Sequence, residues 1–264
     1  YVSLHRYYGN PTQDTPGFLA RSMDLDDFIR EVVSLCDAVG AKKRSRKKLN
    51  LSFDEWNVWY HSDNIPFDKW SEHPHQLEDI YNFEDALLVG SLLITLLCHA
   101  DRVKMACLAQ LVNVIAPIMT TDEGVLRQTI YYPFLHASVF GNGTVLNTIV
   151  KAPVYDSKNF CDVPYIDSVV IYNEETEEAV LFAVNKNLQE DISFSCDLRQ
   201  FEGYRVEEHI ELHDSDLKAV NTEADPYRVV PSKNTKTVIR DGSPPKAAMF
   251  FLTHFSAIIR SSVP

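Results

Sequence analysis

The hydrophobic pattern of this 264-residue chain changes near residue 144, and that change constrains the fold more than any other feature. Before it, short apolar runs alternate with longer segments whose apolar residues recur at helical spacing. Such alternation predicts parallel strands with helices packed outside them. We expect strands at 2–8, 49–54 and 104–110, and helices at 23–40, 77–99 and 127–140.

After residue 144 the strand-like runs are short, and Asn, Asp, Gly, Pro and Ser separate them. This pattern is typical of an antiparallel β-sandwich. The sequence therefore divides into an α/β part at 1–143 and an all-β part at 144–264. The expected sandwich strands are 144–150, 168–172, 179–184, 192–196, 204–212, 235–239 and 247–259.

The α/β part is too small to form a complete α/β domain. Three strand–helix units neither close a barrel nor bury both faces of a sheet well. The chain also starts at Tyr1, without an initiator Met. We therefore expect these residues to be a piece of a longer protein.

Composition and charge exclude several classes of function. The formal net charge of −12 argues against a general nucleic-acid binder. The basic run at 42–48 is interpreted as a solvated helix end, with a nucleic-acid patch as the weaker alternative. The apolar segment 86–98 is too short to span a bilayer and predicts a buried helix. Five widely spaced cysteines without a CxxC pair indicate reduced thiols in a cytoplasmic protein.

Polar side chains stand at the ends of all three predicted parallel strands. His5 and Tyr7 share one face at the end of the first strand. Glu55 follows the apolar residues of the second strand, and Gln110 ends the third. A single Glu after a strand is usually only a loop residue. However, catalytic groups of α/β barrels lie at the carboxyl ends of the strands, so the convergence of these residues indicates a site.

Strand alternation predicts which of the two acids of the second strand enters this site. Leu51, Phe53 and Glu55 share one face, because successive side chains point to opposite faces. On this argument Glu55 points into the site and Asp54 points away. Trp59 follows in the next loop, and Trp56 lies between them. Both tryptophans are either core residues or aromatic platforms of a sugar-binding pocket.

A carboxylate beside a Tyr hydroxyl and an amide suits covalent attack on an anomeric carbon. A retaining glycosidase needs a second carboxyl group about 5–5.5 Å away as acid/base. Glu174 lies in an acidic run that is interpreted as a hairpin turn, and Glu123 is a weak candidate. A metal site at His61, His73 and His75 is disfavoured by their irregular spacing, so neither a metal nor a cofactor is expected.

Four segments closely resemble the α-L-arabinofuranosidases of glycoside hydrolase family 51. They are SLHRYYGN at 3–10, LSFDEWNVWYHS at 51–62, ACLAQLVNVIAPIMT at 106–120 and TIYYPFLHAS at 129–138. The resemblance runs in order over essentially the whole chain. It implies strands six to eight of a (β/α)₈ barrel at 1–143, followed by a jelly-roll sandwich at 144–264.

The resemblance also implies roles for individual residues. Glu55, in DEWN, is similar to the catalytic nucleophile at the end of the seventh barrel strand. Tyr7 resembles the sixth-strand Tyr that hydrogen-bonds this nucleophile, and His5 resembles a supporting residue of the site. Gln110 matches an eighth-strand residue that contacts arabinose, and Trp59 resembles a Trp of the pocket wall.

The implied activity is that of a retaining, exo-acting α-L-arabinofuranosidase, which removes terminal non-reducing groups from arabinan or arabinoxylan oligosaccharides. The family's acid/base Glu lies on the fourth barrel strand, outside these residues, so activity requires the N-terminal half of the barrel. Homo-oligomers, often hexamers, are also implied, with no nucleic-acid or membrane partner. Two alternatives remain open: a non-catalytic carbohydrate-binding or assembly fragment, and a related glycosidase such as an endoglucanase or a β-xylosidase.

Overall fold

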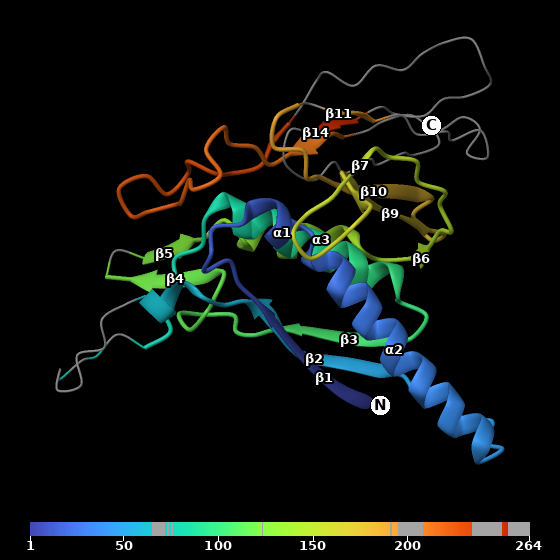
Figure 1. Ribbon diagram of the computed structural model, residues 1–264. Coiled ribbons are helices and arrows are strands. Elements are labelled where there is room, and N and C mark those ends of the chain that lie inside the picture. The colour runs from blue at the N-terminus through green and yellow to red at the C-terminus, as the bar shows by residue number, and fades with distance from the viewer. Residues whose placement is uncertain are drawn as a thin grey trace, which may run out of the picture.

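A small parallel sheet, a layer of helices and a set of antiparallel strands follow one another along the chain in the computed structural model (Figure 1). The structure describes residues 1–64, 72, 74, 76–122, 124–190, 192–194, 208–233 and 250–252. Within these ranges, no helix has the length and the apolar character needed to cross a membrane.

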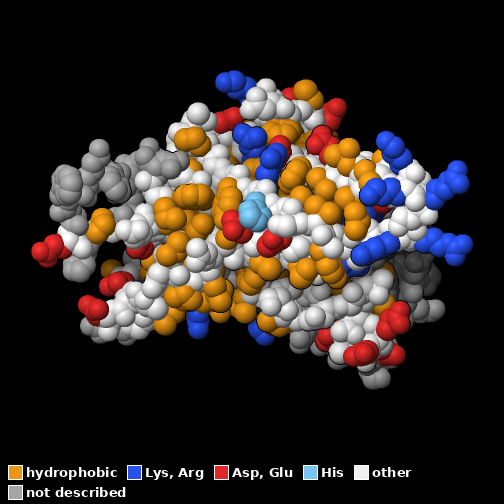
Figure 2. Space-filling model, turned by 90° about the horizontal axis from the view of Figure 1, so that it is seen from below, with side chains coloured by type: hydrophobic (Ala, Val, Ile, Leu, Met, Phe, Trp, Pro, Cys, Tyr) orange, Lys and Arg blue, Asp and Glu red, His pale blue; other side chains and the backbone are white. Residues whose placement is uncertain are grey.

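The parallel sheet has three strands in the order β1-β2-β3. They are β1 (Val2–Tyr8), β2 (Leu51–Val58) and β3 (Val103–Leu108). Figure 1 shows α1, α2 and α3 on the same side of this sheet. Figure 2 views the molecule from below the sheet and shows hydrophobic side chains on that uncovered face, with acidic groups and a histidine near its middle.

The helices of the first part are α1 (Thr15–Leu19), α2 (Arg21–Lys42), α3 (Phe83–Cys98) and α4 (Tyr131–Phe140). Helix α3 is the centre of the core, because every residue from its start to Leu96 is buried. It contacts β2 and β3 on one side, and the antiparallel strands β9 and β10 on the other. This arrangement confirms the predicted helix at 86–98 and its burial as far as Leu96, whereas Cys98 is exposed.

The antiparallel part is built around a three-stranded sheet in the order β10-β9-β6. Its strands are β6 (Thr144–Val145), β9 (Ile166–Asn173) and β10 (Glu178–Asn185). Shorter antiparallel pairs surround it: β7 (Val154–Tyr155) with β8 (Val163–Pro164), β11 (Ile192–Phe194) with β14 (Phe250–Leu252), and β12 (Ile210–Glu211) with β13 (Ser232–Lys233). Core residues of both parts, such as Phe53 and Phe182, belong to one hydrophobic cluster.

The structure confirms the predicted strands at 168–172 and 179–184 and shortens several others. Only Thr144–Val145 is a strand in the predicted 144–150, and Ile192–Phe194 is the strand portion described within 192–196. Residues 210–211 and 250–252 are the strand portions described within 204–212 and 247–259. The predicted strand at 235–239 lies outside the described residues.

Two predicted helices start later than their hydrophobic pattern indicated. Helix α3 begins at Phe83 because Asn82 forms a capping box with Asp85. Helix α4 begins at Tyr131, because a hairpin of β4 (Ile118–Thr121) and β5 (Gly124–Arg127) occupies the preceding residues. Strand β2 extends through the two acids to Val58, four residues beyond the predicted end. In each case hydrogen bonding, in a helix cap, a hairpin or the strand pairing of β2, sets the boundary rather than apolar spacing.

Candidate active site

The uncovered face of the parallel sheet carries the predicted residues of strand β1. Leu4 and Tyr8 are buried on the helix side, so alternation places His5 and Tyr7 on the opposite face. The Tyr7 hydroxyl donates a hydrogen bond of 3.0 Å to Oε2 of Glu55. The His5 ring lies between two acids, with Nδ1 3.6 Å from Glu55 Oε2 and Nε2 3.7 Å from Asp54 Oδ2. The structure thus brings His5, Tyr7 and Glu55 together.

The prediction that Asp54 of strand β2 points away from the site is wrong. Phe53 is fully buried and packs edge-on against Phe28 of α2, so the apolar residues face the helices. The register with β1 shifts from Leu4↔Phe53 to His5↔Glu55, and this irregularity inserts Asp54 as an extra residue. A β-bulge breaks the alternation of side chains. Asp54 and Glu55 therefore both reach the exposed face, and Asp54 does not point away.

Burial and hydrogen bonds shift the pKa values of two groups in this cluster, Tyr7 and Asp54. Burial and the neighbouring Glu55 carboxylate raise the pKa of Tyr7 to about 12, so its hydroxyl stays protonated at neutral pH. Hydrogen bonds from Ser3, at 2.6 Å, and from Ser52 lower the pKa of Asp54. The cluster therefore presents an anionic Asp54 and a neutral hydroxyl donor to the space above the sheet.

Trp59 stands directly beside Tyr7, at the end of strand β2. The two rings meet edge to face, with centroids 5.4 Å apart, and the Trp59 indole N–H donates to Ser62 Oγ at 3.0 Å. Trp59 is partly exposed, as a pocket wall requires, whereas Trp56 is a core residue with 1% exposure. The structure thus separates the two tryptophans that the sequence left ambiguous.

Gln110 follows strand β3 and is exposed. Among the described residues, its side chain makes no hydrogen bond to Glu55 or Tyr7, and its backbone N–H donates to Ile115 O at 3.2 Å. Asn57 fixes this loop against β2, since its amide donates to Ala109 O at 2.8 Å and to Ile115 O at 2.6 Å. Asn57 lies two residues after Glu55, but no pattern in the sequence marked it as part of the site.

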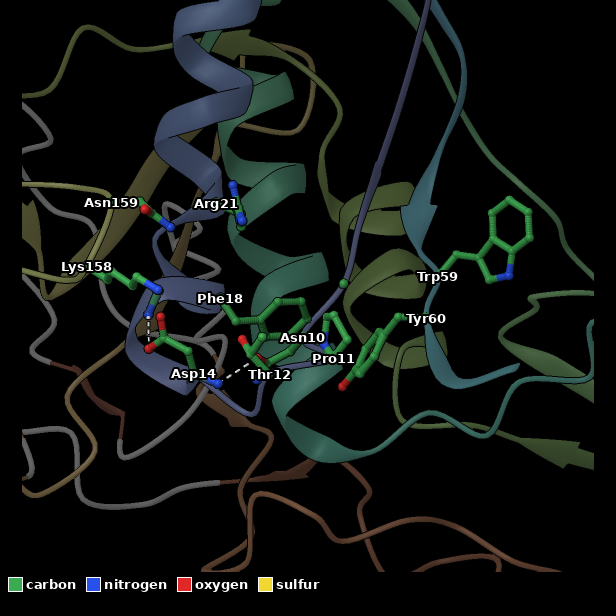
Figure 3. Close-up of a pocket in the computed structure, with 12 residues that line it drawn as sticks. Asn10, Pro11, Thr12, Asp14, Phe18, Arg21, Trp59, Tyr60, Lys158 and Asn159 are labelled. Carbon is green, nitrogen blue, oxygen red and sulfur yellow. Dashed lines mark hydrogen bonds between the residues drawn. The ribbon is translucent and has the colours of Figure 1, made fainter. Parts of the chain in front are cut away.

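A cavity of about 450 Å³ lies beyond the end of β1, outside this cluster (Figure 3). Its lining comes from the β1–α1 loop, the starts of α1 and α2, the end of β2 and the loop at Lys158 and Asn159. Figure 3 shows the Trp59 ring extending away from Tyr60 and Pro11. Trp59 is among the residues that line the cavity, whereas Tyr7 and Glu55 are not.

The other candidate carboxylates and the candidate metal ligands are placed apart from this cluster. Glu174 lies in the turn between β9 and β10, which confirms the hairpin interpretation. Glu123, His73 and His75 lie outside the described residues. His61 pairs with the buried Asp85 at 2.8 Å, and no group of three or more His, Cys, Asp or Glu in the described part of the chain could hold a metal ion.

Comparison with known proteins places the chain in a family. The model of the α-L-arabinofuranosidase C-terminal domain matches residues 54–247. Intracellular exo-α-(1→5)-L-arabinofuranosidases of Halalkalibacterium halodurans and Bacillus subtilis are 56% and 54% identical over 92% and 91% of this chain. The chain covers only 49% and 48% of those two proteins, so it spans about half the length of the curated relatives it matches.

Solved structures agree with this placement. A family 51 α-L-arabinofuranosidase from Bifidobacterium longum aligns with 100% of this chain and 52% of its own, with a TM-score of 0.84 and 35% identity. The α-L-arabinofuranosidase of Thermotoga maritima, solved as an arabinose complex, shares the fold with a TM-score of 0.75 at 22% identity and aligns with 98% of this chain and 52% of its own. The chain therefore belongs to the α-L-arabinofuranosidases of glycoside hydrolase family 51 and contains their C-terminal domain.

Proposed function

We propose that this chain is the C-terminal half of a retaining, exo-acting α-L-arabinofuranosidase in which Glu55 is the nucleophile. The hydrogen bond from Tyr7 to Glu55 on the exposed face of the sheet carries the proposal. Glu55 attacks the anomeric carbon, and the bond to the leaving oxygen breaks as an acid protonates that oxygen. Water then releases arabinose from the enzyme, with the same acid now acting as the base.

The rest of the barrel supplies that second carboxyl group. We infer that residues 1–143 form barrel strands six to eight and that 144–264 form the jelly-roll sandwich. Strands β1 and β3 are the outer strands of the three-stranded sheet, and a closed barrel needs neighbours for both. The relatives are about twice as long as this chain, which leaves length for the first five strands.

The other predicted site residues either contact the substrate or orient the nucleophile. Trp59 forms the pocket wall through its exposed ring, His5 orients the Glu55 carboxylate, and Gln110 contacts arabinose once the loop after β3 faces a complete barrel. We propose terminal α-L-arabinofuranosyl groups of arabinan and arabinoxylan oligosaccharides as substrates, since the relatives are named exo-α-(1→5)-L-arabinofuranosidases. The names of these relatives, which include the word intracellular, also support a cytoplasmic location. We further propose that the complete enzyme forms a homo-oligomer such as a hexamer.

The complete enzyme can be tested with a chimera. The chain is fused to the part of the Halalkalibacterium halodurans relative that precedes its match, and hydrolysis of 4-nitrophenyl α-L-arabinofuranoside is measured. We expect turnover by the chimera and none by the 264 residues alone, because the acid/base comes from the added strands. A folded chimera that binds arabino-oligosaccharides without cleaving them favours the carbohydrate-binding alternative. Preferential cleavage of an aryl β-xyloside or of an internal glucan bond favours a related glycosidase.

Replacing Tyr7 with Phe in the same enzyme is expected to lower kcat about 10- to 100-fold with little change in KM. A hydrogen bond to a charged group contributes about 1.5–3 kcal/mol, and about 1.36 kcal/mol corresponds to a factor of ten in rate. Since the pKa of Tyr7 is about 12, the variant and the wild type should share one pH profile at neutral pH. An unchanged kcat would remove Tyr7 from the site.

A further inference from the structure

We propose that His61 and Asp85 are positioning residues for the Glu55 site, because they hold the segment that presents Trp59 to Tyr7. The proposal rests on the function proposed above. Neither residue touches Glu55, so their effect passes through Trp59. A pocket residue contacts the sugar directly, whereas a positioning residue acts only through the residue that it holds. The two roles therefore predict different results when the variants are combined.

The Trp59 ring is placed by the residues on either side of it. Its backbone N–H donates to Tyr8 O at 2.8 Å, which continues the pairing of β2 with β1. Its indole N–H donates to Ser62 Oγ at 3.0 Å, and Ser62 belongs to the 3₁₀ helix His61–Asn64. The ring edge meets Tyr7 at a centroid distance of 5.4 Å. The position of this 3₁₀ turn therefore decides where the ring stands beside the candidate nucleophile.

Two buried carboxylates anchor the first residue of the turn. The backbone N–H of His61 donates to Asp79 Oδ2 at 3.1 Å, and Nε2 of its ring donates to Asp85 Oδ2 at 2.8 Å. Asp85 is fully buried, and Asp79 is 1% exposed. Asp85 is itself fixed, because it also accepts the backbone N–H of Asn82 in the capping box of α3. The anchor thus joins the turn to the rigid central helix of the core.

The rings around His61 complete the anchor. Tyr60 stacks on His61 with centroids 4.0 Å apart, and its hydroxyl donates to Asp85 Oδ1 at 3.4 Å. Tyr81 meets the imidazole in an edge-to-face contact, with ring centroids 5.9 Å apart. His61 therefore cannot turn without breaking contacts with two buried aromatic residues and a buried acid.

Charge makes the anchor sensitive to pH. Burial by itself would lower the pKa of His61, but the hydrogen bond and charge of Asp85, with a contribution from Asp79, raise it above its ordinary value. Groups that face His61 are Asp79, Asp85, Tyr60, Tyr81 and Lys218, and the charge of Lys218 opposes the increase. Because the folded-state pKa of His61 is raised, the positive charge of His61 is lost as the pH rises through that pKa. Burial also raises the pKa of Asp85, so the ion pair is lost again toward acid pH, when Asp85 is protonated.

The principal variant is His61→Ala in the complete enzyme, assayed on 4-nitrophenyl α-L-arabinofuranoside. We expect kcat/KM to fall about 10- to 100-fold, since small displacements of a positioning group have effects of this size. The loss should lie mainly in KM, because the pocket wall contacts the sugar in both the ground state and the transition state. His61→Gln keeps an N–H donor toward Asp85 and should restore most of the activity. We expect the KM of the wild type to rise as His61 loses its charge at alkaline pH, and the KM of His61→Gln to lack this rise.

A double-variant cycle separates positioning from general stability. If His61 acts through Trp59, His61→Ala adds little to the KM of a Trp59→Ala variant. Fully additive effects, or an unchanged KM in His61→Ala, overturn the proposal. Ser62→Ala removes the acceptor of the Trp59 N–H and alters no buried group, so a raised KM supports the proposal and an unchanged one contradicts it, even if His61→Ala does not fold.

The chain offers a matched control at the other end of the same helix. His99 donates from Nε2 to Asp26 Oδ1 at 2.6 Å and is similarly buried. His99→Ala removes a comparable His–Asp pair far from Trp59 and should leave KM unchanged; a KM raised as much as in His61→Ala overturns the specific role.

Loss of activity in Glu55→Gln with an unchanged KM in His61→Ala rejects this inference alone, whereas full activity in Glu55→Gln rejects the proposed function.

Discussion

Glu55→Gln in the complete enzyme is expected to lower kcat by several orders of magnitude. The amide has nearly the same shape as the carboxylate and can still accept a hydrogen bond from Tyr7, which lies 3.0 Å from Oε2. It is a far poorer nucleophile, however, and an arabinosyl-enzyme ester cannot form normally without the carboxylate. The measurement is kcat on 4-nitrophenyl α-L-arabinofuranoside, with thermal denaturation to verify that the variant is folded.

Asp54→Asn is the matched control, because Asp54 also contacts His5 from the exposed face. If Glu55 is the nucleophile, Asp54→Asn should lower kcat about tenfold or less, because His5 is the predicted site residue that Asp54 contacts and its hydrogen bonds come from Ser3 and Ser52. Added azide should rescue Glu55→Ala and yield an arabinosyl azide of inverted configuration, since one displacement then replaces two. Near-normal turnover by Glu55→Gln, or azide rescue of Asp54→Ala instead, would transfer the nucleophile role to Asp54.

Lys186→Met is expected to destabilise the protein by about 3–5 kcal/mol. The Lys186 side chain is fully buried, and its ammonium group donates to Asp167 Oδ1 at 2.9 Å. Asp167 also accepts from Ser22 Oγ at 3.0 Å, so this pair joins the sheet of β9 and β10 to helix α2. Removing the ammonium leaves a largely buried carboxylate with only a neutral donor. Urea denaturation of wild type and variant measures the loss.

An exposed pair of the same kind provides the comparison. Lys233 donates to Glu208 at 2.7 Å, but the Lys233 side chain is 80% exposed. Lys233→Met should therefore change the free energy of unfolding by about 1 kcal/mol or less. The double variant Lys186→Met/Asp167→Asn should recover part of the loss, because no buried charge is then left alone. Equal effects of the two Lys→Met substitutions would show that burial of the first pair has no energetic consequence.

Much of the site could be predicted because its signals are local. In strand β1, simple alternation correctly separated His5 and Tyr7 from the buried Leu4 and Tyr8. In strand β2 the same rule failed, because the register with β1 slips by one residue at Asp54. A bulge depends on the partner strand, which lies about fifty residues away in the sequence. No periodicity within β2 could therefore reveal it.

The second group of residues was missed for a related reason. In the sequence His61 was considered only as part of a disfavoured metal site, and the structure pairs it with Asp85, 24 residues later. Asn57 looked like an ordinary strand residue, but its amide bonds two carbonyls of the loop that carries Gln110. Both contacts join segments that meet only after α3 has packed against the sheet. Burial, rather than residue type, gives these side chains their roles.

By itself the sequence determined the family, the alternation of β1, β2 and β3 with α2, α3 and α4, and the identity of the polar residues at the strand ends. These follow from apolar spacing and short motifs, which act over a few residues. Tertiary structure alone decided that Asp54 and Glu55 share the exposed face, which two sheets α3 contacts, and that Asp85 anchors the segment beside Trp59. Those features depend on strand register and burial, which exist only when distant segments pack together.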